Sequence, residues 1–182
     1  YLRGEKLWFE AGSDVAELQK AVGQYEQAVS LDPGFAVAWA RLGQVRSLIY
    51  YNGIPAADLA EAARANVERA LELVPDLAAG RLAQANFFLW VTKDYQRARE
   101  VIREGLAAES GNAELLLGAG TAEMSLGRWD EALAYFGRAR SIDPRSPRTL
   151  FRTGSALLWT RRYKEAKDVF DQTLAILPVQ VA

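Results

Sequence analysis

The chain has 182 residues, of which half are hydrophobic and a quarter are charged, and its formal net charge is −1. It contains neither cysteine nor histidine. The missing cysteine excludes disulfides, thiolate metal sites and a cysteine nucleophile. The missing histidine removes the commonest transition-metal ligand and the side chain that most often transfers protons near neutral pH. A net charge this close to zero gives no overall attraction to nucleic acid or to an anionic membrane.

The sequence shows no apolar run near the roughly 18 residues that a membrane-spanning helix needs. It begins with Tyr1, and its only methionine, Met124, lies deep inside the chain. We interpret it as a fragment of a longer protein, so a missing targeting signal says nothing about the parent. The compartment stays open, with the cytoplasm favoured over the periplasm.

Pairs of amphipathic helices are predicted along the whole chain. Their approximate bounds are 1–35, 36–78, 79–112, 113–146 and 147–182. Four second helices are expected to end just before a proline, because proline disfavours helical geometry in the preceding residue. These prolines are Pro33, Pro75, Pro144 and Pro178. Helix-capping side chains are expected at Asp76, Asn112 and Ser146, the last being followed by Pro147.

The first two pairs have insertions between their helices. We predict that the first helix of the second pair extends to about Tyr51, that the chain turns at Asn52-Gly53 and that Pro55 starts the next helix. Two alternatives stay open for the insertion around Tyr50 to Pro55. It is either a tolerated surface loop or a contact surface formed by the two tyrosines.

Residues of the same kind recur every 34 positions in the last three pairs. The recurring sets are Leu82, Leu116 and Leu150; Tyr95, Trp129 and Tyr163; Ala98, Ala132 and Ala166; and Ile102, Phe136 and Phe170. Small residues such as Gly120 and Ala132 let two helix backbones approach closely, and Phe136 fills the gap beside them. In the first pair Gly4 is assigned to the same small-residue position, with a truncated first helix.

These sets resemble the tetratricopeptide repeat, whose pattern is W-x2-L-G-x2-Y, then A-x3-F, then P. The resemblance covers nearly the whole chain. It implies an all-α fold, a right-handed superhelical solenoid of about five antiparallel helical hairpins that form a single domain. Three positions depart from the pattern. Asn86 replaces a small residue and should find a backbone partner or loosen its helix pair, while Arg46 and Glu123 replace the tyrosine and are expected to be partly exposed.

The same resemblance implies a concave groove lined by the first helices, where family members typically bind peptides or helices. The groove residues carried over by position are Arg41, Gln44, Phe87, Trp90, Leu117, Thr121, Met124, Arg148, Phe151, Arg152, Ser155 and Trp159. Their aromatic content favours an apolar or amphipathic segment of a protein or peptide partner. The alternative is that the aromatic side chains pack between neighbouring first helices.

No catalytic set, metal constellation or cofactor motif is found, so we expect a non-enzymatic interaction scaffold without a cofactor. The opening Tyr1-Leu2-Arg3-Gly4 with Leu7-Trp8 is similar to the start of repeat arrays in some bacterial signalling proteins. The alternative function is therefore a regulatory or sensor module of a larger signalling enzyme or transcription regulator, with an intramolecular ligand.

Two surface features lie near the C-terminus. A basic stretch from Arg138 to Lys167 is either a solvated outer face or a patch for an acidic peptide or nucleic acid, although nucleic-acid binding is not expected for the chain as a whole. Val169, Leu174 and Ile176 are candidates for an uncovered end surface. The array would then continue in the parent, or self-associate through its uncapped ends.

Overall fold

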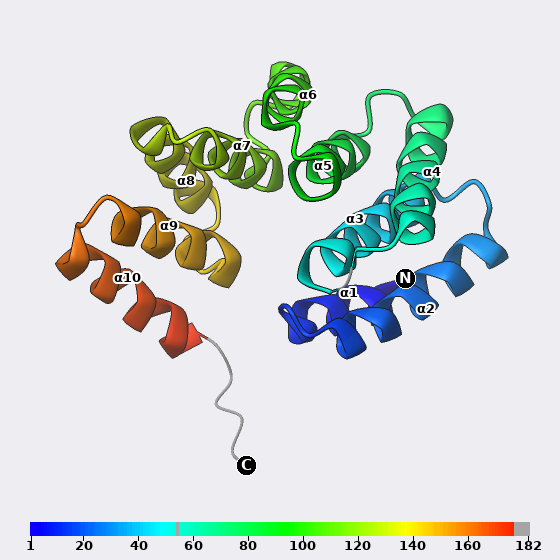
Figure 1. Cartoon of the computed structure of the whole chain (residues 1–182), viewed down its shortest axis with the longest axis horizontal. Helices are drawn as coiled ribbons and strands as arrows, with labels where there is room; N and C mark the ends of the chain where they lie inside the picture. Colours follow the sequence, from blue (N-terminus) through cyan, green and yellow to red (C-terminus); the bar gives the residue numbers. More distant parts are fainter. Residues whose placement is uncertain (54, 177–182) are drawn as a thin grey trace, which may run out of the picture. The chain divides into compact units, whose positions relative to one another are not determined.

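The computed structural model describes residues 1–53 and 55–176, and within them all the regular elements are helical, arranged as five consecutive hairpins (Figure 1). The first two are α1 (Leu2–Ala11) with α2 (Val15–Leu31), and α3 (Ala36–Asn52) with α4 (Ala57–Leu73). In the third, α5 (Ala78–Phe87) continues into a π-helical turn, η1 (Phe88–Thr92), before α6 (Tyr95–Ala108). The last two are α7 (Ala113–Ser125) with α8 (Trp129–Ile142), and α9 (Pro147–Trp159) with α10 (Tyr163–Ile176). The predicted all-α hairpin architecture is confirmed.

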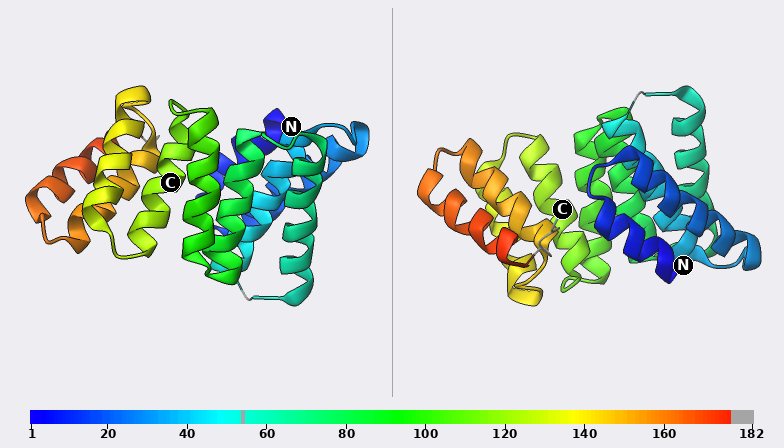
Figure 2. Two further views of the ribbon diagram at one scale, coloured as in Figure 1. Left: turned by 90° about the horizontal axis from the view of Figure 1, so that it is seen from above. Right: turned by 90° about the horizontal axis from the view of Figure 1, so that it is seen from below.

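The hairpins fall into two compact units, which divide between Ala108 and Glu109. Unit 1 contains α1 to α6 and unit 2 contains α7 to α10. The two helices of a hairpin lie side by side, as the views of α1 with α2 and of α9 with α10 show (Figure 2). The single domain and the right-handed superhelical course of the whole array stay predictions.

Glycines set the distance between the two helices in the first, fourth and fifth hairpins. A β-carbon on Gly120 of α7 would lie 2.3 Å from Cε1 of Phe136 in α8, and one on Gly154 of α9 would lie 2.7 Å from Cε1 of Phe170 in α10. At Gly4 of α1 the corresponding distance to Cε1 of Tyr25 is 2.9 Å. Each aromatic ring therefore occupies the space that a glycine leaves, which confirms the predicted small-residue positions.

Helix ends follow the sequence signals at two of the three expected caps. Asn112 Oδ1 accepts a hydrogen bond from the Leu115 amide at 3.1 Å, and Ser146 Oγ accepts one from the Thr149 amide at 3.3 Å. The expected cap at Asp76 is wrong, because Leu77 is the N-cap of α5 and Asp76 instead faces Arg81 at 3.6 Å.

The insertion in the second hairpin differs from its prediction at one end. The helix α3 extends to Asn52 and Gly53 follows as its C-cap, close to the predicted turn. The helix α4 begins at Ala57, two residues after Pro55, so the predicted helix start is wrong. The backbone before α4 is extended at Ala56, which is the conformation that suits an N-cap residue.

Arg46 and Glu123 both replace the tyrosine of the repeat pattern, and they differ in burial. Arg46 is half-buried, as expected, and bonds to Asn66 and Glu26. Glu123 was expected to be partly exposed, but 4% of its surface is accessible. Its carboxylate lies 3.7 Å from the Arg128 guanidinium, and a paired charge of this kind can be buried.

Val169 and Asn86 are the other two residues whose surroundings bear on the sequence analysis. Val169, a candidate for the uncovered end surface, is buried with Leu150, Leu157 and Ala166. Asn86 is buried too, and the helix leaves α-helical geometry as η1 two residues after it. Across the described ranges, none of the helices is long and apolar enough to cross a membrane.

Candidate functional site

The first helices of unit 1 present an aromatic patch, which we define as Tyr51, Phe87 and Trp90. The helix α3 packs against α5 and η1. This brings the rings of Tyr51 and Trp90 to 6.4 Å between centroids. Phe87 lies one turn before Trp90 and is half-buried, as is Trp90 itself, whereas 59% of the Tyr51 surface is exposed. The patch therefore offers apolar ring surface to solvent from two neighbouring helices.

Two expected groove residues of unit 1, Arg41 and Gln44, are buried instead. Arg41 Nη1 donates to Gln44 Oε1 at 2.9 Å, its Nε lies 3.3 Å from Glu5 Oε1, and its guanidinium lies over the Trp8 ring. Glu5 and Trp8 belong to α1, so this cluster holds α1 against α3. We therefore leave Arg41 and Gln44 out of the binding surface.

The same cluster includes Tyr25, whose hydroxyl donates to Glu5 Oε1 at 2.7 Å. Burial is the main reason that the pKa of Tyr25 is raised, and the bond to the Glu5 carboxylate raises this pKa further because both favour the protonated phenol. The nearby Arg41 charge lowers it by a smaller amount. A side chain held in this way serves the fold of the first hairpin rather than a ligand.

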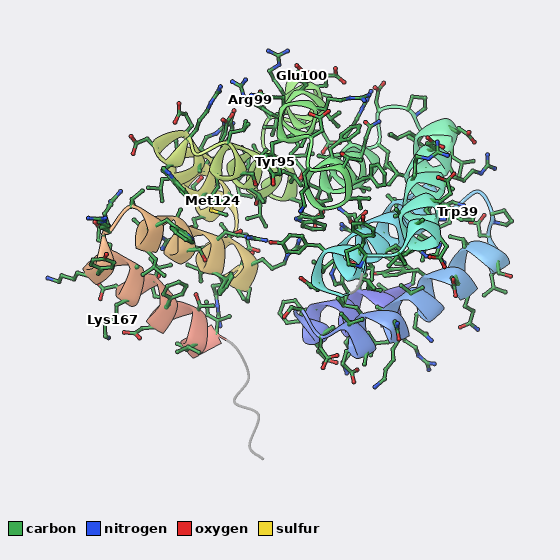
Figure 3. The ribbon with its side chains drawn as sticks, in the orientation of Figure 1. Trp39, Tyr95, Arg99, Glu100, Met124 and Lys167 are labelled. Carbon is green, nitrogen blue, oxygen red and sulfur yellow. The ribbon has the colours of Figure 1, made fainter. Side chains whose placement is uncertain are left out.

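In unit 2 the expected groove residues of α7 pack against other helices. Leu117 and Met124 are partly buried against a cluster that includes Phe136 of α8 and Ala156 of α9. Figure 3 shows Met124 on the side of α7 that faces α9. Thr121 is buried, and its hydroxyl donates to the Leu117 carbonyl at 2.9 Å. These residues match the alternative in which groove positions serve the packing between helices.

The helix α9 holds the five other expected residues. Phe151 and Trp159 are both exposed, and each has one aromatic neighbour: Phe151 lies 6.0 Å from the Phe170 ring, and Trp159 stacks on Trp129 at 6.3 Å. Ser155 is half-buried and donates to the Phe151 carbonyl at 2.9 Å. Of the two arginines, Arg148 is exposed and Arg152 is half-buried.

The sequence analysis named Tyr51 only as part of a possible contact surface with Tyr50 and did not place it beside the groove residue Trp90. It did not name Trp129 as a site residue. The stacking of Trp129 on Trp159 had no signal in the 34-residue pattern, because it joins the start of one second helix to the end of the next first helix.

Charged residues on α8 and α10 are largely engaged locally. Arg162 bonds to Glu165 at 2.7 Å, Lys167 to Asp171 at 2.6 Å, and Arg140 to Gln172 at 3.2 Å. Arg162 directly precedes α10 and its partner Glu165 lies in the first turn of that helix, whereas Lys167 and Asp171 both lie on α10. Exposed pairs of this kind stabilise a fold little. Within residues 1–53 and 55–176, no three carboxylates gather as a metal site would require.

Comparisons with known proteins agree with this geometry. A family model described as tetratricopeptide repeat matches residues 117–180. A stretch of 76 residues is 41% identical to protein O-mannosyl-transferase TMTC1 of Mus musculus. The matched stretch is 39% of this chain and 7% of that protein, so the likeness concerns a small part of the relative.

Solved structures resemble the chain over most of its length. The protein TTC0263, a thermophilic TPR protein of Thermus thermophilus, superposes with a TM-score of 0.78 at 17% identity, over 98% of this chain and 90% of that one. YrrB, a TPR protein with an unusual peptide-binding site, has a TM-score of 0.56 at 20% identity, over 92% and 82% of the two chains.

A third structure, the second TPR of Spaghetti (RPAP3) bound to the HSP90 peptide SRMEEVD, has a TM-score of 0.52 at 25% identity and covers 57% of this chain and 95% of that one. None of these descriptions mentions bacterial signalling, so that context stays a prediction. The family match over residues 117–180 and the fold shared with TPR structures over most of the chain confirm the resemblance to the tetratricopeptide repeat.

Proposed function

We propose that the chain is a non-catalytic scaffold that binds a peptide or helix of a partner protein on its first helices, with the aromatic patch of unit 1 as the anchor. The observation that supports this most is the exposure of Tyr51 beside Trp90 on two neighbouring first helices. Two similar proteins are described as peptide-binding, YrrB and the Spaghetti TPR with its HSP90 peptide.

Aromatic rings of this kind suit a binding role on physical grounds. A ring has a large apolar surface but few rotatable bonds, so ordering it costs little entropy when a partner covers it. Energetic hot spots at protein interfaces are enriched in tryptophan and tyrosine. The Tyr51 hydroxyl can also donate to a peptide carbonyl while its ring packs on an apolar side chain. The expected ligand is therefore an apolar or amphipathic segment.

Arg41 and Gln44, the two polar residues predicted for the groove in this region, are engaged inside the α1–α3 cluster. Apolar contact is then the main source of affinity in the patch. Binding on the patch should consequently depend weakly on salt, because screening acts on exposed charges rather than on buried apolar area.

The test is a selection of displayed random peptides on the purified chain, followed by affinity measurements on three forms of it. These are the unchanged chain, a Tyr51→Ala plus Trp90→Ala variant, and a Phe9→Ala control that removes an exposed aromatic ring of α1 outside the patch. We expect the selected peptides to bind the unchanged chain and the control alike, and the patch variant at least about tenfold more weakly. Equal binding to all three forms would show that the aromatic patch does not bind the selected peptides.

A further inference from the structure

The aromatic patch of unit 1 carries two hydrogen-bond donors that the fold does not use. Across residues 1–53 and 55–176, neither the Tyr51 hydroxyl nor the indole Nε1 of Trp90 makes a hydrogen bond, and Nε1 is open to solvent. A structural indole behaves differently, because Trp39 Nε1 donates to the Pro33 carbonyl at 3.0 Å. Both donors of the patch are therefore available to a ligand.

The two rings that carry these donors form one surface. Their centroids lie 6.4 Å apart and their planes are inclined by 35°. Trp90 belongs to η1, and short π-helical turns of this kind are frequent at functional sites. The patch lies on the second and third hairpins, which have a hairpin before and after them in the sequence. Its exposure is therefore no consequence of where the sequence ends.

Two neighbouring donors require a ligand with free carbonyl groups. The carbonyl groups inside a helix are bonded to its own amides, whereas a polyproline II segment has no internal hydrogen bonds. Proline also lacks an N–H group, so it brings no backbone donor that the apolar patch would leave unpaired. Two residues of such a segment advance by about 6.2 Å, which is close to the separation of the two rings. A proline-rich segment thus fits the patch better than a helix does.

Basic side chains border the patch. Lys93 directly follows η1, is exposed and has a left-handed backbone conformation with φ 58°. Arg97 is also exposed, and its Cζ lies 4.6 Å from the centre of the Phe88 ring, which makes an edge contact with Phe87. The acid between the two cations, Asp94, accepts a hydrogen bond from the Arg97 amide at 3.1 Å. Acidic residues in the ligand would complement Lys93 and Arg97 and add modestly to the affinity, because both cations are exposed.

We propose that the aromatic patch binds a proline-rich segment of a partner protein in the polyproline II conformation, with acidic residues that meet Lys93 and Arg97. The proposal rests on the proposed function and names the composition and conformation of its ligand. The sequence has six prolines, and no two of them are adjacent. It therefore supplies no such segment itself, and neither would a second copy of the chain.

Three labelled peptides test the proposal by fluorescence anisotropy on the whole chain. The proline-rich probe has the sequence PPLPPLPPDD. The alanine probe, AALAALAADD, keeps its leucines and its charge but favours a helix. The basic probe, PPLPPLPPKK, changes only the charge. We expect the proline-rich probe to bind at least about tenfold more tightly than the alanine probe, because its conformation is formed in advance. It should bind roughly two- to fivefold more tightly than the basic probe.

Matched variants of the chain separate the donors from the charge. Tyr51→Phe plus Trp90→Phe removes both donors but keeps a ring at each position, and it should weaken the proline-rich probe about tenfold. Lys93→Asn removes a charge with a residue that tolerates the left-handed backbone, and it should weaken this probe roughly two- to fivefold. The control is Arg161→Asn, an exposed basic residue with a left-handed backbone in the last hairpin, which should change nothing. Circular dichroism checks that each variant is folded.

Equal affinities of the proline-rich and alanine probes would overturn the proposal, and so would full affinity of the proline-rich probe for Tyr51→Phe plus Trp90→Phe. Self-association that Tyr51→Ala plus Trp90→Ala abolishes would overturn it too, because a second copy would then occupy the patch. The proposed function fails separately. Selected peptides that bind the patch as helices would reject only the proline-rich ligand, whereas selected peptides that bind Tyr51→Ala plus Trp90→Ala unchanged would reject the patch itself.

Discussion

Gly120 and Phe136 face each other across the α7–α8 hairpin so closely that a β-carbon on the glycine would lie 2.3 Å from Cε1 of the ring. Phe136 is fully buried, and the same cluster includes Ala132 of α8 and Ala156 of α9. One contact thus sets the separation of two helices and the surface on which a third helix packs.

Substituting Gly120→Ala should lower the free energy of unfolding by about 1–3 kcal/mol, because a methyl group would overpack the hairpin. The matched control is Gly137→Ala in α8, where a β-carbon would have no neighbour within 4 Å. That change should stabilise the protein by about 0.5–1 kcal/mol, since alanine is the better helix former. Urea unfolding of both variants measures the difference. Equal effects of the same sign would contradict this account of the hairpin.

Helix capping gives a second pair of substitutions. Asn112→Ala should cost about 1 kcal/mol, because the side chain accepts a bond from the Leu115 amide at 3.1 Å. Asp76→Ala should cost much less, because Asp76 caps no helix and is mostly exposed. Thermal unfolding followed by circular dichroism ranks the two. A larger loss from Asp76→Ala would show that the helix start at α5 is misassigned.

The cluster that joins α1 to α3 gives a third prediction. Arg41→Ala should cost about 2 kcal/mol, because it removes the partner of the half-buried Glu5 carboxylate, and the partial exposure of Glu5 keeps the cost below that of a fully buried pair. Arg64→Ala is the control, since its pairs with Glu61 and Glu68 lie on the exposed side of α4. Urea unfolding should separate the first variant clearly from the unchanged protein and leave the second near it. Similar midpoints for both variants would contradict a structural role for Arg41.

Alkaline pH should destabilise the protein through Tyr25. Its pKa in the folded chain is raised, mainly by burial, whereas an unfolded tyrosine ionises near about 10. Above that pH the unfolded chain releases a proton that the folded chain keeps, so the free energy of unfolding falls as pH rises. Below the pKa of the unfolded tyrosine, the stabilisation that Tyr25 provides is fully present. The check is to measure the free energy of unfolding of the unchanged protein and of Tyr25→Phe between about pH 8 and 11. The free energy should fall less with pH in the variant. Parallel pH dependences of the two proteins would refute the prediction.

The 34-residue pattern could predict the hairpins because small residues and rings at fixed spacing determine how two helices pack. Gly120 with Phe136 and Gly154 with Phe170 are examples. The pattern could not predict burial at Glu123, because that depends on Arg128, which is specific to one hairpin. Arg41 is a similar case: its burial requires Glu5 and Trp8 from another hairpin.

The groove positions were predicted less well than the hairpins, for a physical reason. A position on the inner side of a first helix faces either a ligand or the next helix, and spacing alone does not separate the two. Leu117 and Met124 face the neighbouring helix α9. Phe151 and Leu158 occupy the same repeat positions 34 residues later but are exposed, so the same spacing occurs in both surroundings.

Peptide binding by the first helices of unit 1, through Tyr51, Phe87 and Trp90, can be tested residue by residue. The most direct measurement is the change in amide chemical shifts of the isotopically labelled chain when a selected peptide is added. We expect the largest changes in α3, α5 and η1, and their loss in the Tyr51→Ala plus Trp90→Ala variant. Shifts confined to α4 and α6, and unchanged in that variant, would place binding on the second helices and contradict the claim.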